Sequence, residues 1–339
     1  MSMKALVIHE YGPAENLKYE DIEKPVIQGS DELIIKVKAA GVNPVDFKIR
    51  KGYLQIALKM NMPAILGIDF AGIVDSVGEN VHGFKIGDEV YGKLGTPNSN
   101  GSYAEFIKVD TKKDPLLLKP SNLSFEEAAA VGVTGFTAFV ALVEHGKLEK
   151  NDGKKVLVIG ASGGVGYWTV QLAKALGANV TGICSTANVE FVKSLGADHL
   201  IDYKKQDIKD ALTTLDQHYD IVVDCVGGDD YWKTTEPFIT KGGVYSTAAG
   251  PVEHGGHGPL TFGTIIGMGL TIGPRYLFGR TSYKFISALP NQFPKILDDL
   301  LKSGEVKSIV NHSFKIENGV DAHLQSESNR TVGKIVLTV

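Results

Sequence analysis

The sequence predicts an α/β protein with two domains, one of mostly antiparallel β-strands and one a doubly wound parallel sheet. The chain has 339 residues, which is too long for one ordinary hydrophobic core and suggests about two domains. Up to residue 123 the sequence shows short strands separated by turns, whereas from Ser124 onward apolar strands alternate with helices. The first pattern is typical of an antiparallel sheet and the second of a parallel one.

The composition describes a globular protein that acts on a small molecule. Hydrophobic residues make up 43% and charged residues 22% of the chain, and the formal net charge is -4. Because basic residues are not in excess, we expect no binding to nucleic acid or to an anionic membrane. Cys184 and Cys225 each lie in an apolar run, which predicts reduced core thiols, with a disulfide between them as the alternative.

Two segments bear on the compartment. Residues 1–12 enter a strand pattern without a secretory signal or an Arg-rich presequence, which predicts the cytosol and leaves an association with mitochondria open. The apolar stretch at residues 260–273 is interrupted by glycines and is shorter than the roughly 18–20 residues of a membrane span. We therefore expect it to be buried protein.

The first domain is expected to contain residues 1–123. Alternate positions between residues 31 and 41 are apolar, and the positions between them include Lys36 and Lys38, which predicts a half-buried antiparallel strand. Ser124 and Glu127 then form a capping box that predicts the start of a helix.

The second domain is expected to contain residues 124–275. Apolar runs alternate with helical segments, two of which end at Gly177 and Gly196, and this pattern predicts a parallel sheet covered on both faces. The predicted strands are 155–160, 179–184, 199–203, 220–228 and 242–250. Residues 276–339 add a helix at 293–304 and a final strand at 333–339, and we assign them to the first domain.

A glycine-rich segment at residues 156–166, VLVIGASGGVG, predicts dinucleotide binding. It follows an apolar strand and opens a helix, with Ala161, Gly163 and Gly166 in the pattern A-x-G-x-x-G. Gly163 would let the backbone approach a pyrophosphate, and Gly166 would let the helix pack against the strand. The alternative is a glycine-rich turn that serves packing alone.

The end of the second strand favours NADP(H) over NAD. An acidic residue there would bind the ribose hydroxyl of NAD and repel a 2′-phosphate. This chain has Ser185 and Thr186 instead, and small hydroxyls with free backbone N–H groups suit a phosphate. The expected arginine is missing, and Lys193 or Lys204 could substitute for it.

Five motifs together resemble the zinc-free quinone oxidoreductase branch of the medium-chain dehydrogenase/reductase superfamily. They are residues 40–53, 65–78, 87–92, 101–106 and 156–166. The sequence is similar to zeta-crystallin-like quinone reductases, reticulon-4-interacting-protein-like reductases and plant alkenal reductases over nearly its whole length. The resemblance implies a GroES-like catalytic domain from both chain ends, a Rossmann domain, and NADPH in the cleft between them. Lys48 is a departure, because zeta-crystallin-like members carry tyrosine there.

The resemblance also indicates that both zinc sites of the superfamily are lost. The catalytic zinc needs a thiolate where this chain has Asn43 and an imidazole where it has Ile68. The structural zinc needs four cysteines, and residues 93–106 contain none. We therefore expect no metal, with His254 and His257 as the weaker alternative site.

Without zinc, the chemistry favours an acceptor that is already electrophilic, such as a quinone or an α,β-unsaturated carbonyl compound. The candidate catalytic residues lie in one segment and are Asn43, Asp46, Lys48 and Tyr53. Pro44 should hold Asn43 extended. Lys48 could donate to a nicotinamide ribose or to the developing enolate, with Asp46 orienting it, and Tyr53 could donate a proton. For each of them the alternative is a solvated or packed side chain.

Further cofactor contacts are implied by position in the family and by the rule that dinucleotides lie at the carboxyl ends of parallel strands. They are Thr134, Gly160, Ala161, Ser162, Gly163, Gly164, Val165, Gly166, Ser185, Thr186, Tyr203, Gly227, Gly228, Thr247, Ala248, Ala249 and Lys334. Asp69 replaces the neighbour of a zinc ligand, and we expect it to be structural.

Three further expectations complete the sequence-based account. The edge of the parallel sheet, expected near residues 270–273, predicts a homodimer. An NADPH-binding sensor or structural protein with little catalysis is one alternative function. A reductase of enoyl thioesters is the other.

Overall fold

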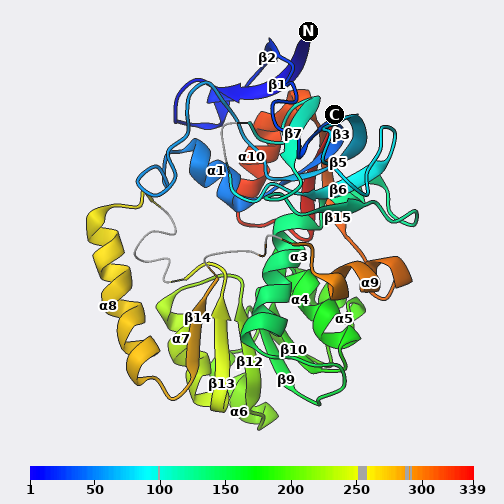
Figure 1. Ribbon diagram of the computed structural model, residues 1–339. Helices are drawn as coiled ribbons and strands as arrows, with labels where there is room; N and C mark the ends of the chain where they lie inside the picture. The colour runs from blue at the N-terminus through cyan, green and yellow to red at the C-terminus, as the bar shows by residue number, and fades with distance from the viewer. Residues whose placement is uncertain (98–99, 251–257, 287–289, 291) are drawn as a thin grey trace. The chain divides into compact units, whose positions relative to one another are not determined.

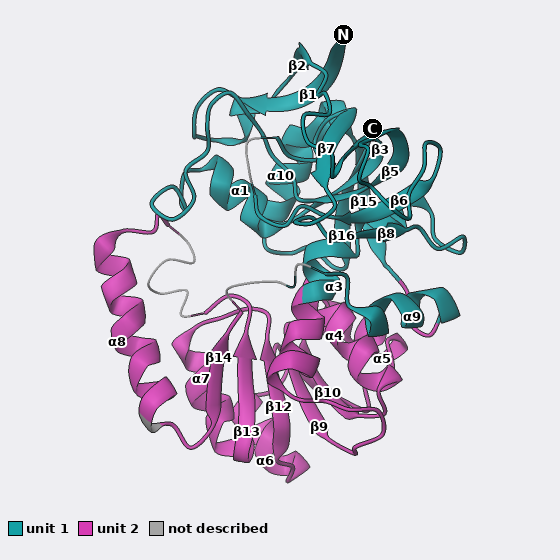
Figure 2. Ribbon diagram, in the orientation of Figure 1, with its two compact units in different colours: residues 1–136, 290–304, 308–339 teal, residues 137–289, 305–307 magenta. Residues whose placement is uncertain are grey.

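The computed structural model describes residues 1–97, 100–250, 258–286, 290 and 292–339. The chain forms two compact units, which Figure 2 colours separately. Unit 1 contains residues 1–136, 290–304 and 308–339, and unit 2 contains residues 137–289 and 305–307. Both ends of the chain therefore fold into the same unit.

Unit 1 is built on two sheets of mostly antiparallel strands (Figure 1). The small sheet has the order β2-β1-β4, and the large sheet has the order β15-β16-β3-β5-β6-β8, with β7 also pairing β3. The strands are β1 (Ser2–Ile8), β2 (Lys18–Glu23), β3 (Glu32–Val42), β4 (Ala64–Ile65), β5 (Asp69–Val77), β6 (Glu89–Lys93), β7 (Phe106–Asp110), β8 (Leu116–Leu118), β15 (Val310–Lys315) and β16 (Lys334–Thr338). The helices are α1 (Pro44–Arg50), α2 (Phe125–Ala129), α3 (Gly132–Phe139, which enters unit 2), α9 (Lys295–Ser303) and α10 (Gly319–Glu327).

The two local patterns expected in this part of the sequence are confirmed. The apolar positions of β3, Leu33, Ile35, Val37 and Ala39, are buried in the core, and Lys36 between them is exposed. Ser124 Oγ accepts a hydrogen bond from Glu127 N–H (3.1 Å), and the Glu127 carboxylate accepts one from Ser124 N–H (2.8 Å). The capping box therefore starts α2 as predicted.

Unit 2 is a parallel six-stranded sheet with the order β11-β10-β9-β12-β13-β14. In chain order this is 3-2-1-4-5-6, the order of a dinucleotide-binding Rossmann fold. The strands are β9 (Lys155–Ile159), β10 (Asn179–Cys184), β11 (His199–Asp202), β12 (Tyr219–Asp224), β13 (Ile239–Thr247) and β14 (Ser282–Phe285). The helices are α4 (Gly164–Ala175), α5 (Val189–Ser194), α6 (Ile208–Leu215), α7 (Asp229–Thr235) and α8 (Phe262–Phe278).

The boundaries of the two units differ from those expected at residues 123/124 and 275/276. Helix α2 packs against β3 and β5 of unit 1, so the chain leaves unit 1 only after residue 136. Strand β14 extends the parallel sheet beside β13, so unit 2 continues beyond residue 275. The helical pattern after Ser124 marked a change of secondary structure and not a change of domain.

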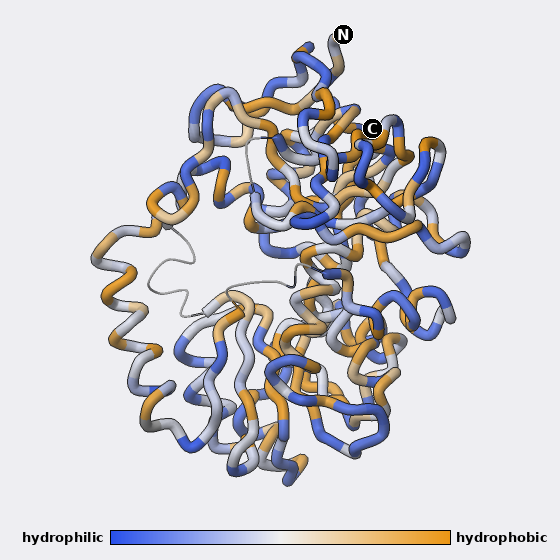
Figure 3. Tube along the Cα trace, in the orientation of Figure 1, coloured by the Kyte–Doolittle hydropathy of each residue, from blue (hydrophilic) through white to orange (hydrophobic). Residues whose placement is uncertain are grey.

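Residues 260–273 are not buried protein, and residues 270–273 are not an edge strand, which corrects both expectations. They lie largely in α8, which exposes Phe262 (76%), Leu270 (72%) and Leu277 (76%), and Figure 3 shows apolar residues along this helix. Arg275 holds α8 on unit 2 through an ion pair with Asp229. The edge strand is β14. Within the described ranges, no helix is long and apolar enough to cross a membrane.

Both cysteines are free thiols, as the sequence predicts. Burial raises the pKa of Cys184 to about 11 and that of Cys225 still further, with a smaller contribution from a neighbouring aspartate in each case. A thiol with a raised pKa stays protonated and is a poor nucleophile at neutral pH. We therefore assign neither cysteine to the chemistry of the protein.

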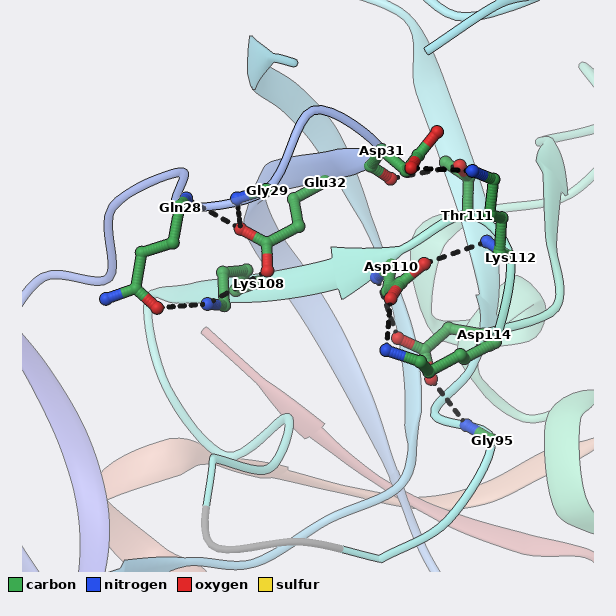
Figure 4. Close-up of polar contacts among 11 residues, drawn as sticks. Gln28, Gly29, Asp31, Glu32, Gly95, Lys108, Asp110, Thr111, Lys112 and Asp114 are labelled. Atoms are coloured by element: carbon green, nitrogen blue, oxygen red, sulfur yellow. Dashed lines mark hydrogen bonds and ion pairs between the residues drawn. The ribbon is translucent and has the colours of Figure 1, made fainter. Parts of the chain in front are cut away.

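Carboxylates fix the loops at one end of β3 and β7 in unit 1 (Figure 4). Asp114 accepts hydrogen bonds from Gly95 N–H (2.7 Å) and Asp110 N–H (2.8 Å). Glu32 accepts two more from backbone N–H groups of the turn before it, at 2.7 and 2.9 Å. Because their partners are backbone N–H groups, with Lys108 as a further partner of Glu32 (3.1 Å), we interpret these carboxylates as groups that fix loops and not as part of an active site.

Candidate active site

The glycine-rich turn of unit 2 has the geometry that a pyrophosphate requires. Gly160 ends β9 with φ 75°, a value that suits glycine. A Cβ on Gly166 would lie 2.1 Å from Gly160 O, so only glycine lets α4 approach the strand this closely. A Cβ on Gly163 would meet only one atom, at 3.5 Å, so protein atoms leave space beside this residue. The turn therefore fits a dinucleotide phosphate at the N-terminus of α4.

The segment after β10 holds the residues expected to select the ribose substituent. Ser185 is half-buried, Thr186 is exposed, and Asn188 donates a hydrogen bond from its side chain to Ser162 Oγ (3.0 Å). Tyr203, expected near the adenine, is 42% exposed, and Lys204 Nζ lies 5.3 Å from the centroid of its ring. These side chains lie at the carboxyl ends of β10 and β11, where an adenosine ribose would bind.

Asp202, a carboxylate that the sequence analysis missed, lies beside this segment. It ends β11 and lies opposite Cys184 of β10 in the sheet. Cys184 immediately precedes Ser185 in the sequence. A hydrogen bond from the Thr186 side chain is the largest cause that lowers the pKa of Asp202, and Lys204 N–H also donates to it (3.0 Å). Thr186, assigned to a cofactor phosphate, therefore lies close enough to the Asp202 carboxylate to affect its ionisation.

The loops after β12 and β13 are held together by Asp224. Its carboxylate accepts hydrogen bonds from Gly227 N–H (2.8 Å) and from the hydroxyl of Thr247 (3.0 Å). Gly228 N–H donates to Gly250 O (3.0 Å), which joins the two loops directly. The predicted contacts Gly227, Gly228, Thr247, Ala248 and Ala249 therefore belong to one connected structure at the carboxyl edge of the sheet.

In unit 1, the segment expected to hold the catalytic residues contains helix α1. Asn43 is extended (φ −122°, ψ 151°), as predicted from Pro44, and it is the N-cap of this helix. Asn43 N–H donates to the Asp46 carboxylate (2.7 Å), which completes a capping box. Pro44 occupies the first position of the helix, where proline is common.

Asp46 does not orient Lys48, which corrects the expected arrangement. Its carboxyl group is buried, and Oδ2 accepts hydrogen bonds from Asn43 N–H and from Tyr103 Oη (2.7 Å). Oδ1 is buried without a hydrogen-bond partner. Burial raises the pKa of Asp46 to about 7, although both hydrogen bonds act to lower it. Asp46 therefore faces the interior of unit 1.

Because Asp46 is buried, we expect stability to depend on its protonation. A carboxyl with a raised folded-state pKa stabilises the fold most below its unfolded-state pKa of about 3.9, and this contribution is lost as pH rises toward 7. Asp46→Asn should reduce the change in the free energy of unfolding with pH by up to about 1.4 kcal/mol per pH unit. Thermal unfolding from about pH 5 to pH 8 would measure it, with Asp21→Asn at an exposed aspartate as control. An unchanged pH dependence in Asp46→Asn would contradict the assignment.

Asn43, Asp69 and Lys334 form a buried polar cluster in unit 1, and at most 2% of each residue is exposed. Asn43 Nδ2 donates to Asp69 Oδ2 (2.9 Å), and Lys334 Nζ donates to the same oxygen (3.0 Å) and to Asn43 Oδ1. Asp69 Oδ1 accepts Val133 N–H (2.8 Å) at the start of α3. Asp69 thus connects three elements, which supports the structural role expected for it.

This cluster changes how three predicted site residues can act. Both polar atoms of the Asn43 side chain and two donors of Lys334 are engaged inside the protein, so neither group is free to move toward a ligand. Thr134 lies in the same region and donates from Oγ1 to Ala130 O (3.1 Å). Their contacts with a cofactor stay predictions. The sequence contained no signal for the cluster, because its members come from distant segments.

Lys48 is the best-placed candidate donor in this segment. It lies half-buried on α1, and no side chain in the described part of the chain pairs with its ammonium group. Burial lowers the pKa of Lys48. Tyr53 is also half-buried, follows α1, and donates its backbone N–H to Lys48 O (2.9 Å). Lys48 and Tyr53 are therefore the two expected catalytic side chains whose polar groups have no hydrogen-bond partner among the described residues, although Lys51 Nζ lies 5.8 Å from the centroid of the Tyr53 ring.

The positions that hold catalytic zinc in the resembling dehydrogenases have other roles here. Ile68 is buried in the hydrophobic core of unit 1, and the Asn43 side chain is bonded to Lys334 and Asp69. Within the described ranges, no group of three His, Cys, Asp or Glu side chains could hold a metal ion. His254 and His257 lie outside the described residues.

A Rossmann sheet with an open glycine turn, in a chain that also forms an antiparallel unit with a buried polar cluster, is typical of an oxidoreductase that uses a nicotinamide cofactor. Two family models match: the alcohol dehydrogenase GroES-like domain at residues 29–121 and a zinc-binding dehydrogenase family at residues 195–337. The chain belongs to the medium-chain dehydrogenase/reductase superfamily, among its quinone and alkenal oxidoreductases. It is an NAD(P)H-dependent reductase of this type.

Three comparisons support this assignment. The chain is 36% identical to a tomato (Solanum lycopersicum) 2-methylene-furan-3-one reductase, over 99% of this chain and 79% of that protein. It is 33% identical to the human mitochondrial NAD(P)H oxidoreductase RTN4IP1, over 99% of this chain and 89% of that protein. The solved structure of the quinone oxidoreductase from Coxiella burnetii has a TM-score of 0.81 and 28% identity, and it covers both chains completely.

Proposed function

We propose that this protein uses NADPH to reduce quinones or α,β-unsaturated carbonyl compounds without a metal ion. The observation that carries the proposal is the Lys48 ammonium on α1, which is half-buried and has no side-chain partner among the described residues, so that it can donate to an oxygen that gains negative charge. The relatives support the choice of substrate, since one is named a reductase of a conjugated ketone and another a quinone oxidoreductase. The expected cytosolic location stays a prediction, because one relative is mitochondrial.

The residues of the chain suggest how such a reaction proceeds. Bound NADPH supplies a hydride, and the turn at residues 160–166 would hold its pyrophosphate. In a conjugated acceptor, negative charge develops on the substrate oxygen as the hydride arrives. The Lys48 ammonium has no side-chain partner in the part of the chain that the structure describes, so it can donate to that oxygen, and Tyr53 can supply the proton. A donor of this kind acts more strongly on the transition state than on the bound substrate.

The experiment that tests the proposal follows NADPH oxidation with a panel of acceptors. Quinones, enals and enones should be reduced, and saturated aldehydes should not. Faster reduction of enoyl thioesters of increasing chain length would favour that alternative substrate class. NADPH binding with no oxidation by any acceptor would overturn the proposed activity in favour of a sensor or structural role.

We expect activity to be independent of metal. Treatment with a chelator should leave turnover unchanged, because Asn43 and Ile68 occupy the positions that would bind zinc and are poor zinc ligands. Elemental analysis should find less than one zinc per chain. Loss of activity with the chelator, followed by recovery with zinc, would contradict this expectation and point to His254 and His257.

We also propose that the protein is a homodimer that pairs the free edge of β14 with its copy. Among the described residues, β14 pairs with β13 only, and α8 packs against β14 and exposes an apolar face. Unpaired strand edges and apolar patches are both stabilised by a two-fold contact. Light scattering should give twice the 36.4 kDa mass of the chain.

A matched pair of variants tests the dimer. Leu270→Glu with Leu277→Glu on α8 should produce monomers, whereas Leu324→Glu, at an exposed position of α10 in unit 1, should leave the dimer intact. A monomeric mass for the unmodified protein at micromolar concentration would exclude the proposal.

A further inference from the structure

The loops that follow β12 and β13 are both bonded to one buried carboxylate, Asp224. Oδ1 accepts hydrogen bonds from Val226 N–H (2.9 Å) and Gly227 N–H (2.8 Å). Oδ2 accepts hydrogen bonds from the hydroxyls of Tyr245 (2.9 Å) and Thr247 (3.0 Å). Four donors from two strands and their loops therefore converge on a side chain that is 1% exposed.

Through the loop after β12, the Asp224 carboxylate also affects the glycine turn that follows β9. Asp224 lies opposite Ile159 in the sheet, at the end of β9, so its loop begins beside the glycine turn. A Cβ on Gly160 would lie only 2.8 Å from Val226 Cγ2. The position of Val226, fixed by its N–H bond to Asp224, therefore bounds the space around Gly160.

The hydrogen bonds continue from the Thr247 side chain to the backbone of both loops. Thr247 Oγ1 donates to Asp224 and accepts Gly250 N–H (2.9 Å), while Gly250 O accepts Gly228 N–H (3.0 Å). Gly227 and Gly228 have φ values of 85° and 107°, a region that favours glycine and needs support from surrounding contacts. Asp224 thus supports the backbone on both sides of the loop pair.

The electrostatic environment of Asp224 indicates a specific role and not a generic stabilising one. A buried carboxylate is costly to desolvate, and within the described ranges no cation forms an ion pair with it. Burial raises the pKa of Asp224, and its four hydrogen bonds act against this effect. A valine or leucine would fill such a position in a strand at lower cost.

We propose that Asp224 is a positioning residue for cofactor binding: it holds residues 225–228 and 247–250, and through Val226 the turn at Gly160, in the arrangement that accepts the nicotinamide dinucleotide. This inference rests on the proposed use of NADPH. Asp224 itself is buried under these loops, and its effect reaches the cofactor only through their backbone.

Asp224→Ala should weaken NADPH binding, measured by fluorescence titration, by about tenfold or more, since four buried donors lose their acceptor. The KM for a quinone should change by less than about twofold, because no residue of unit 1 is altered. Asp224→Asn should recover most of the affinity, because its amide oxygen accepts both N–H groups and its amide nitrogen donates to the two hydroxyls after they rotate.

Asp220 provides a matched control on the same strand. Its carboxylate accepts Lys155 N–H (2.9 Å) and the Thr240 hydroxyl (3.2 Å) near the other end of β12. Asp220→Ala should lower the melting temperature and leave the dissociation constant of NADPH unchanged. Hydrogen exchange should show faster exchange at residues 226, 227 and 250 in Asp224→Ala only.

The outcomes separate this inference from the proposed function. If the unmodified protein binds NADPH and Asp224→Ala binds it equally well while these amides exchange faster, the positioning role is wrong and the proposed function stands. Equal weakening in Asp220→Ala and Asp224→Ala would show a general loss of stability and would also overturn it. If the unmodified protein binds neither NADPH nor NADH, both the proposed function and this inference fail.

Discussion

Lys48→Met should lower the turnover of enone reduction by about 10²-fold, equivalent to about 2.7 kcal/mol of transition-state stabilisation. Lys48 is half-buried on α1, and its ammonium group pairs with no side chain of the described residues, so it is available to donate to a developing enolate oxygen. A quinone is more reactive and needs less help, so its reduction should fall less. The affinity for NADPH should stay nearly unchanged. Steady-state kinetics with an enone and a quinone, together with NADPH titration, would measure these effects.

Lys51 provides the control for this substitution. It is the C-cap of the same helix, but its ammonium group pairs with Glu327, so Lys51→Met should leave both reactions within about twofold. Tyr53→Phe should show the same preference for enones if Tyr53 supplies the proton. If Lys48→Met weakens NADPH binding and slows both reactions equally, Lys48 is a cofactor contact and its catalytic role is excluded. If neither Lys48→Met nor Tyr53→Phe changes either rate beyond about twofold, the segment only shapes the pocket.

Ser185→Asp should reverse a preference for NADPH over NADH. A carboxylate at this position would repel the 2′-phosphate, and a like-charge contact in a poorly screened site costs several kcal/mol. It would also accept hydrogen bonds from the ribose hydroxyls of NADH. Dissociation constants for both nucleotides, measured on the unmodified protein and the variant at the same ionic strength, would test the reversal. Equal constants for the unmodified protein would contradict the assignment of NADPH.

Asp202 provides a second test of the choice between NADPH and NADH. Its carboxylate ends β11 opposite Cys184, the residue before Ser185, so it adds negative charge near the expected ribose position. Asp202→Asn should therefore strengthen NADPH binding more than NADH binding, the opposite direction to Ser185→Asp. If Asp202→Asn affects both nucleotides equally, its carboxylate acts on the fold and not on the choice of cofactor.

Much of the fold could be predicted from local sequence, because its signals lie within short windows. The strand-turn-helix at residues 156–166 and the alternation of strands and helices were enough to predict the parallel sheet, and the capping box at Ser124 predicted the start of α2. Helix α8 was not predicted, because its apolar residues were interpreted as buried protein with an edge strand near residues 270–273. Its exposed apolar residues have no local signature that separates them from a buried segment.

The candidate site was predicted less completely, because its partners are neighbours in space and not in sequence. Asp202 lies next to Ser185 only because β11 pairs with β10, and Asp224 reaches Thr247 only because β13 pairs with β12. The inward orientation of Asp46 depends on Tyr103, which is 57 residues away. Residue type therefore indicated which side chains could act in catalysis or binding. Contacts between distant segments determine which of these side chains are already bonded inside the protein.

The most direct test of metal-independent conjugate reduction follows the hydride itself. Chelator-treated protein would be incubated with an enone and with NADPH that carries deuterium at the transferred position, and the product would be analysed by NMR. We expect a saturated ketone with deuterium on the former β carbon. An allylic alcohol with deuterium on the carbinol carbon, or product formation only after zinc is added, would contradict the proposed function.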